Sequence, residues 1–165
     1  MTVTSASPSA DDASRLALPE LGEVIALNIA PESGAAMEAV TELQVQAGVG
    51  IAGDRYHGSR HRHVSVQSAE ELAEASTALG RAIEPFETRR TITLAHGRIP
   101  TTPGTELVIG GVRLEVVRIA APCAVMDDEI GRGARAALRR RAGVVCRAVS
   151  SGRIALADPA ISRPA

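Results

Sequence analysis

Apolar and polar positions alternate along much of the chain after residue 20, and a period of two predicts β-strands. Alternating segments occur at 41–48 and 63–67; the segment 22–30 has the composition of a strand, and 89–95 is a further strand candidate. The stretch "TELVIGGVRLEVVRI" (105–119) predicts a hairpin that turns at its Gly-Gly pair, and a change of apolar side predicts a bulge near 116–117. Two more strands are expected around the Ser-Ser-Gly turn within 143–159.

Two segments have helical character. Ser68 followed by Glu71 forms a capping box, and Gly80 stands where a left-handed C-terminal glycine is expected, which predicts a helix between them. A second helix is expected over 127–143, with acids first and arginines last, and with its regular part delayed by Gly131 and Gly133. Many short strands and few helices predict a mostly β fold, a distorted β-barrel with two or three peripheral helices.

The expected organisation is a disordered leader (1–20), one domain (21–160) and a short tail (161–165). The chain is 45% apolar but only 1% aromatic, so the core must be aliphatic. The leader lacks the basic and apolar regions of a secretory signal, no apolar run is long enough to span a bilayer, and two cysteines do not make a disulfide framework. A cytoplasmic location is therefore expected.

The charge of the chain limits the kinds of binding partner that are expected. The net charge of −1 gives no global field for nucleic acid or membranes, and stacking aromatics are nearly absent, so neither partner is expected. Every basic residue is arginine, because the sequence contains no lysine. A Schiff base, including one with lysine-bound pyridoxal phosphate, is therefore excluded for this chain.

The two cysteines have different surroundings in the sequence. Cys123 follows the strand 112–119 and Pro122, where a thiol can act as a nucleophile or a soft-metal ligand; the alternative is a buried, inert cysteine. Cys146 lies within an apolar strand and is expected in the core.

The loop "GDRYHGSRHRH" (53–63) holds three of the four histidines and three arginines, and it permits three interpretations. A metal site of His57, His61 and His63 lacks a second cluster of ligands to complete it. An anion site is favoured by flanking glycines, which free backbone N–H groups, and by the forked donors of Arg55, Arg60 and Arg62. Arg89 and Arg90 extend this basic patch; the remaining interpretation is a solvated basic loop.

The ordered set of segments resembles a known family. "GIAGDRYHG", "RHVSVQSAEEL", "ETRRTITLAHG", "PGTELVIGGVRLEVVRIAAPC" and "RRRAGVVCRAVSSGRIALAD" are together similar to a MOSC domain, the C-terminal domain of molybdenum cofactor sulfurases. The resemblance covers residues 22–160 and implies a barrel-like fold, a molybdopterin-type cofactor and one key cysteine, Cys123.

The resemblance also implies the roles of individual residues. Cys123 would carry sulfur as a persulfide or coordinate molybdenum. The positions that it assigns to cofactor binding are Asp54, Arg55, His57, Arg62, Arg89 and Thr91. The sequence departs from the family pattern at Tyr56, where histidine is frequent, at Thr91, where asparagine is usual, and at Ala120, where some members have a second cysteine.

The expected function is therefore a molybdenum cofactor binding protein, which would be a sulfur transferase or a reductase component. Its partners would be the cofactor and either a sulfur donor or a molybdoenzyme. The alternatives are a molybdenum-dependent reductase of N-hydroxylated compounds with an external electron donor, and a non-catalytic anion-binding module.

Overall fold

The computed structural model describes residues 20–165, so the expected leader lies outside the described residues except for Glu20. The fold is mostly β, as predicted. The strands are β1 (Glu20–Ile29), β2 (Glu38–Val40), β3 (Glu42–Gln46), β4 (Gly50–Ile51), β5 (Val64–Ser68), β6 (Ile92–Leu94), β7 (Glu106–Ile109), β8 (Val112–Ile119), β9 (Val144–Ala148), β10 (Gly152–Ala155) and β11 (Pro159–Arg163). The helices are α2 (Ala69–Leu79), α3 (Val125–Glu129) and α4 (Ala134–Ala137).

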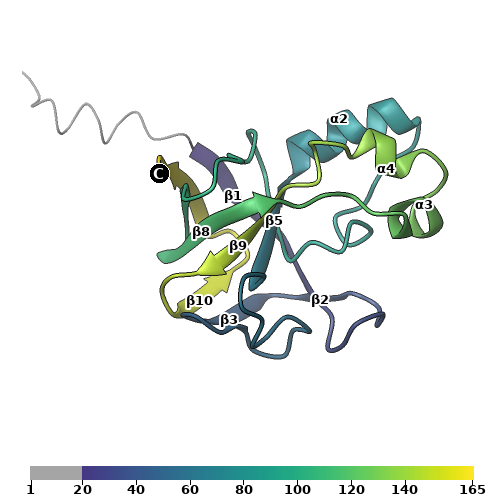
Figure 1. The fold of residues 1–165 in the computed structure, drawn as a ribbon. Helices are drawn as coiled ribbons and strands as arrows, with labels where there is room; N and C mark the ends of the chain where they lie inside the picture. The colour runs from purple at the N-terminus through teal and green to yellow at the C-terminus, as the bar shows by residue number, and fades with distance from the viewer. Residues whose placement is uncertain (1–19) are drawn as a thin grey trace, which may run out of the picture.

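Seven strands close into a barrel. The large sheet has the order β11-β7-β8-β9-β5-β6-β1-β2, and β11 also pairs with β1, which leaves β2 outside the closed ring. The pairing of β5 with β6 is parallel because α2 forms the crossover between them. A second sheet, β10-β3-β4, lies beside the barrel (Figure 1). The predicted barrel is confirmed.

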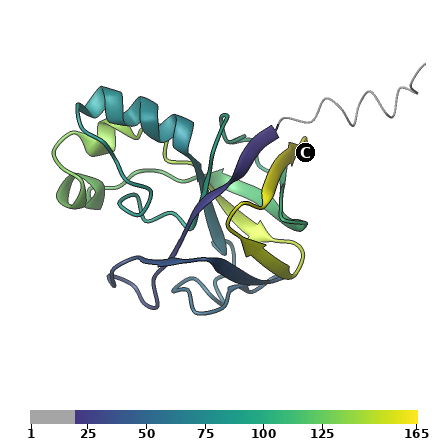
Figure 2. The same ribbon diagram turned by 180° about the vertical axis from the view of Figure 1, so that it is seen from behind.

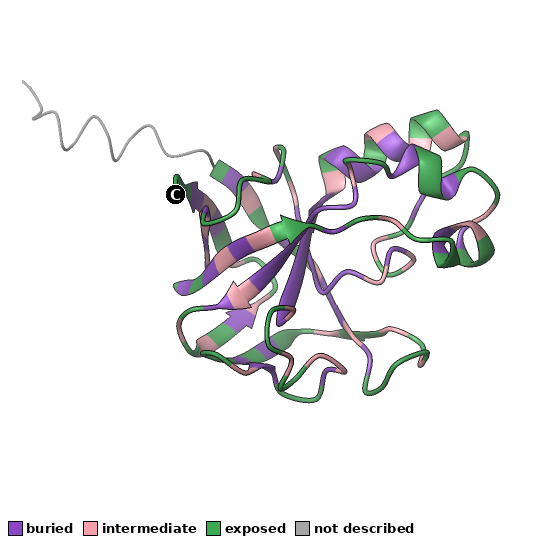
Figure 3. Cartoon of the chain, viewed as in Figure 1, coloured by how far each residue is buried: buried purple, intermediate pink, exposed green. Residues whose placement is uncertain are grey.

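The barrel interior is aliphatic. Burial alternates along β7 and the first part of β8, as expected for strands with one face in the core. Every residue of β5 is buried, since the barrel lies on one side of this strand and α2 packs against it (Figure 3). The core therefore needs no large aromatic side chain.

The helices form a layer at one end of the barrel (Figures 1 and 2). They share a second apolar cluster, which includes Leu72 from α2, Met126 from α3 and Leu138 after α4. The N-cap and the C-terminal glycine predicted for α2 are confirmed: the Ser68 hydroxyl accepts hydrogen bonds from the backbone N–H groups of Glu70 and Glu71, and Gly80 is left-handed. The reciprocal half of the capping box is not formed, because the Glu71 carboxylate accepts from the Ile99 N–H (3.2 Å) instead.

The prediction of one helix over 127–143 is wrong. The chain forms the two short helices α3 and α4, with Gly131 (φ 138°) and Gly133 (φ 93°) between them in backbone conformations that a continuous helix does not allow. The glycines therefore break the helix instead of delaying its start.

The remaining predictions concern the second half of the chain. The bulge is confirmed, because the register between β8 and β9 shifts between Val116 and Arg118. The two strands around the Ser-Ser-Gly turn are present, but they join different sheets, since β10 pairs with β3. Strand β11 continues the barrel to Arg163, past the expected domain end at residue 160, because its backbone pairs with both β1 and β7. No helix within residues 20–165 is both long and apolar enough to cross a membrane.

Candidate functional site

A pocket of about 360 Å³ lies where loops of the barrel meet the helical layer. Four segments distant in sequence form it: the loop between β1 and β2, the 53–63 loop, the turn before β6, and the chain from the end of β8 into α3. Its lining residues are Ser33, Gly34, Arg55, Tyr56, Arg62, Arg89, Arg90, Ala121, Cys123, Val125, Met126 and Glu129. Four of the twelve are arginines and one is an exposed cysteine.

Asp54 organises the 53–63 loop from beneath and does not line the pocket. It is 5% exposed, and its carboxylate accepts hydrogen bonds from the backbone N–H groups of Ala30 (3.2 Å) and Tyr56 (3.1 Å). The same carboxylate lies 3.5 Å from the Arg55 guanidinium, which also donates to the Arg89 carbonyl oxygen (3.2 Å). Asp54 therefore fixes both the turn and the direction of Arg55.

The ring of Tyr56 is in contact with two guanidinium groups. The Cζ atoms of Arg55 and Arg62 are 4.6 Å and 4.2 Å from the centre of its ring, within the range of cation–π contacts. The Nε atom of Arg62 is buried without a hydrogen-bond acceptor. Burial lowers the pKa of Arg62, and the nearby positive charges of Arg118 and Arg55 lower it further. The positive charge of Arg62 is therefore only partly balanced by hydrogen-bond acceptors and negative charges around it.

Arg89 and Arg90 enter the site from the turn before β6. Arg89 has a left-handed backbone (φ 59°), donates to the Ala35 carbonyl oxygen (2.8 Å), and lies 3.9 Å from the Glu129 carboxylate. Arg90 is 3% exposed and donates to the carbonyl oxygens of Ala142 (2.8 Å) and Ala120 (3.4 Å).

Arg90 has no acidic partner. No carboxylate within residues 20–165 forms an ion pair with it. Burial lowers the pKa of Arg90 to about 10, and the positive charge of Arg62 contributes in the same direction. A buried cation of this kind is stabilised by an anion, which the neighbouring protein does not supply.

Cys123 lies at the rim of the pocket, just after the end of β8. It is exposed, and its carbonyl oxygen accepts a hydrogen bond from the Met126 N–H (3.0 Å) at the start of α3. A negative charge on Cys123 raises the pKa values of both Arg62 and Arg90, so a thiolate here lies within their electrostatic reach. Cys146, in contrast, is fully buried in β9, and burial raises the pKa of its thiol.

Three residues predicted to bind a cofactor lie outside the pocket: Asp54, as described above, His57 and Thr91. His57 is exposed, with its Nε2 atom 3.2 Å from the Gln46 side-chain oxygen. Thr91 is buried in front of β6, where its N–H donates to the Ser65 hydroxyl (3.0 Å). Arg55, Arg62, Arg89 and Cys123 do line the pocket.

The histidines do not assemble a metal site. His63 is buried; its Nδ1 accepts from the Ala148 N–H (3.0 Å) and its Nε2 donates to the Ser59 carbonyl oxygen (2.7 Å), so it ties the loop to β9. Across the part of the chain that the structure describes, no group of three His, Cys, Asp or Glu side chains is placed to hold a metal ion.

Several lining residues were not assigned a binding role from the sequence. Arg90 was expected to extend the basic patch but was not among the residues assigned to cofactor binding, although its two carbonyl partners fix it in the wall of the pocket. Tyr56 was noted only as a departure from the family pattern. Met126 and Glu129 had no predicted role, because the short helix α3 was not predicted as a separate element. The adjacent pair Arg89-Arg90 before a buried strand was the one available signal.

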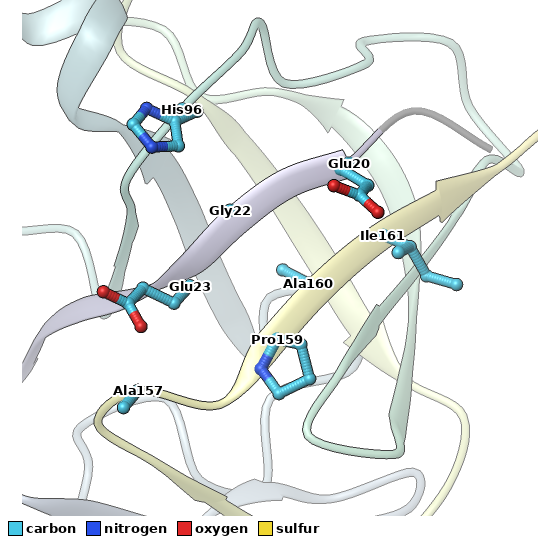
Figure 4. Close-up of a pocket in the computed structure, with 8 residues that line it drawn as sticks. All are labelled: Glu20, Gly22, Glu23, His96, Ala157, Pro159, Ala160 and Ile161. Carbon is cyan, nitrogen blue, oxygen red and sulfur yellow. The ribbon is translucent and has the colours of Figure 1, made fainter. Parts of the chain in front are cut away.

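Two other pockets lack this combination of groups. One of about 390 Å³ is lined by residues of β1 and β11, among them Glu20 and Glu23, which lie apart along β1 (Figure 4). Neither a cysteine nor an arginine lines it. The other, of about 650 Å³, shares Ala121 with the 360 Å³ pocket that Cys123 lines, called the thiol pocket from here on, and presents Arg135 and Arg139 with Asp127. Positive charge therefore continues beside Cys123.

The fold and the site together describe a small β-barrel protein with a thiol-containing pocket. In this pocket an exposed cysteine and four arginines lie where the barrel meets the helical layer. The family model of the MOSC domain matches residues 53–160, and the chain belongs to this family, which is associated with molybdenum cofactor-related proteins.

Solved structures share the fold. The YuaD protein from Bacillus subtilis superposes with a TM-score of 0.77 at 17% identity, over 86% of this chain and 94% of that one. YiiM from Geobacillus stearothermophilus gives a TM-score of 0.69 at 14% identity, over 88% and 76%. YiiM from Escherichia coli gives 0.65 at 12% identity, over 87% and 70%. No curated protein sequence matches the chain.

Proposed function

We propose that the chain binds the molybdenum cofactor in the pocket beside Cys123, and that Cys123 carries sulfur as a persulfide or coordinates the metal. The observation that carries this proposal is the convergence of four arginines on one exposed thiol. Membership of the MOSC family, which is associated with molybdenum cofactor-related proteins, supports this choice of cofactor.

The charges of the pocket support an anionic ligand. Arg55 is paired with Asp54 and Arg89 lies near Glu129, whereas Arg62 and Arg90 form no ion pair within residues 20–165. Two guanidinium groups thus remain for a phosphate, which matches their forked donors. The volume of about 360 Å³ is within the range of small-molecule sites.

Each group has a distinct proposed role. Arg62 and Arg90 hold the phosphate end of the cofactor, with Arg55 and Arg89 beside them. Cys123 offers the soft sulfur ligand that suits a metal such as molybdenum. When bound, the cofactor would supply the redox and sulfur-accepting chemistry of its metal, while the chain's own residues bind it, orient it and present the thiol.

Asp54, His57 and Thr91 take different parts in this proposal. Asp54 positions the loop and Arg55 through its three contacts. His57 and Thr91 act at most through the loop and β6, since neither lines the pocket. The proposal therefore depends on the arginines and the thiol.

Cofactor content tests the proposal. The protein is purified from a host that makes molybdenum cofactor, and bound molybdenum and pterin are measured in wild type, Cys123→Ser, Arg62→Gln and the control Arg147→Gln. Arg147 is paired with Glu115 on the barrel surface, away from the pocket. We expect pterin in the wild type and the control, less pterin in Arg62→Gln, and pterin with reduced molybdenum in Cys123→Ser if the thiol is a metal ligand. Wild-type protein without pterin would overturn the proposal.

A further inference from the structure

The thiol pocket has the features required to take a sulfur atom from a small dianion. We propose that thiosulfate, or a sulfane-sulfur oxyanion of the same kind, loads Cys123 directly and leaves a persulfide on it. The inference rests on the proposed role of Cys123 as a sulfur carrier, but it does not require that the cofactor be bound.

The first argument is charge. Arg90 is nine-tenths buried or more and meets only the carbonyl oxygens of Ala142 and Ala120, so its positive charge has no counter-charge among the described residues. Arg62 adds a second unpaired guanidinium with a buried Nε that lacks an acceptor. Two unpaired cations in one pocket match an anion with two negative charges, and forked N–H donors match its oxygens.

The second argument is the position of the nucleophile. Cys123 lines the same pocket and is exposed, so an oxyanion bound by Arg62 and Arg90 would lie beside its sulfur. The arginines would also offset the repulsion between a thiolate and a dianion, which otherwise opposes their approach. The position of Cys123 beside these arginines therefore reduces the electrostatic repulsion that opposes the reaction.

The reaction balances without an external oxidant or reductant. The Cys123 thiolate attacks the outer sulfur of thiosulfate, a new S–S bond forms on Cys123, and the S–S bond of thiosulfate breaks. Sulfite leaves with the bonding electron pair, and the persulfide keeps the single negative charge of the thiolate. No proton is consumed or released.

The third argument is the fate of the persulfide. A neighbouring thiol would discharge it by forming a disulfide, but Ala120 stands where a second cysteine would complete a CxxC pair. The other cysteine, Cys146, is fully buried in β9. Because the chain also lacks lysine, it cannot itself form the pyridoxal phosphate Schiff base through which cysteine would supply sulfur. An anionic donor from solution can fill this role.

The test uses the reduced protein without cofactor. It is incubated with thiosulfate, and the mass added at Cys123, the sulfite released, and the thiocyanate formed on addition of cyanide are measured. We expect one added sulfur atom per chain, located at Cys123, with equal sulfite, and none in Cys123→Ser. Sulfate, which has the same charge and shape but no transferable sulfur, should compete.

Arg62→Gln separates binding of the anion from reactivity of the thiol. We expect the thiosulfate concentration for half-maximal loading to rise by about tenfold, as for the loss of one charge-assisted hydrogen bond. An uncharged organic trisulfide with one equivalent of an uncharged thiol serves as the second donor: Cys123 attacks the central sulfur and displaces an alkyl thiolate, and the added thiol then cleaves the mixed trisulfide to leave the persulfide and a disulfide. Loading by this donor should change much less in Arg62→Gln, and Arg147→Gln should match the wild type with both donors. Far-UV circular dichroism verifies that each variant is folded.

The possible results are decisive. If wild-type protein gains no sulfur from thiosulfate but gains it from the trisulfide, the proposed donor is wrong and the carrier role remains. If neither donor loads Cys123, the carrier role fails as well. Loading that is insensitive to Arg62→Gln and to sulfate would overturn the anion site, while cofactor binding is judged separately from pterin content.

Discussion

The two cysteines show how one side chain acquires opposite properties within one small fold. Cys146 lies in β9 between β5 and β8, in register with Val64 and Val116, and is fully buried. Cys123 comes just after the end of β8, where the chain leaves the barrel, and is exposed in a pocket lined by arginines. The thiol within strand β9 is therefore shielded from solvent, whereas the thiol just beyond the end of strand β8 is available to react.

The arginines around the two thiols differ in the same way. On the barrel surface near Cys146, Arg147 pairs with Glu115 at 2.9 Å. Beside Cys123, Arg62 and Arg90 have no carboxylate partner within residues 20–165. Uncompensated charge in a pocket costs stability and is typical of a binding site, where the ligand supplies the missing anion.

The largest expected effect is in thiol alkylation. In the native protein iodoacetamide should modify Cys123 readily, because this side chain is exposed. The rate of modification of Cys146 should be lower by a factor on the order of a thousand or more, because Cys146 reacts only after the barrel opens. Peptide mass spectrometry over time gives both rates. Rates within about tenfold of each other would mean that β9 opens locally and would remove the contrast.

A serine scan gives the next largest effect, on stability. Cys146→Ser should lower the free energy of unfolding by about 1–3 kcal/mol, because a hydroxyl would be buried among apolar residues without a partner. Cys123→Ser should change it by less than about 0.5 kcal/mol, since the side chain is exposed. Urea unfolding followed by far-UV circular dichroism measures both, as the chain has no tryptophan. Equal losses would contradict the assignment of Cys146 to the core.

The barrel could be predicted from the sequence because its strands obey a simple rule. Alternation along β7 and β8, the Gly-Gly turn and the bulge after Val116 are local patterns, and each appears where it was expected. The closure through β11 could not be read in this way, because the pairing of β11 with β1 joins opposite ends of the chain. The prediction of one helix over 127–143 was wrong because the charge pattern favours a helix, whereas Gly131 and Gly133 adopt positive φ angles that interrupt it.

The site was predictable only in part, for a related reason. Cys123, Arg55, Arg62 and Arg89 stood out by residue type and by resemblance to the family. Arg90 became a pocket residue only through tertiary contacts with the carbonyl oxygens of Ala142 and Ala120. The sequence therefore predicted the chemical groups of the site better than it predicted which residues line the pocket.

The smallest expected effect concerns the cost of the unpaired charge. Arg62→Met keeps an apolar side chain over the Tyr56 ring but removes a positive charge and an Nε atom that lacks an acceptor. Without an anionic ligand, we expect the free energy of unfolding to rise by up to about 1 kcal/mol at low ionic strength, and by less at high salt, where repulsion from neighbouring arginines is screened. Arg147→Met, which breaks a surface pair, should instead lower it by less than about 1 kcal/mol. Urea unfolding at two salt concentrations compares the variants. If Arg62→Met lost stability in low salt, Arg62 would serve the fold as Arg147 does, and the difference between the pocket and the barrel surface would disappear.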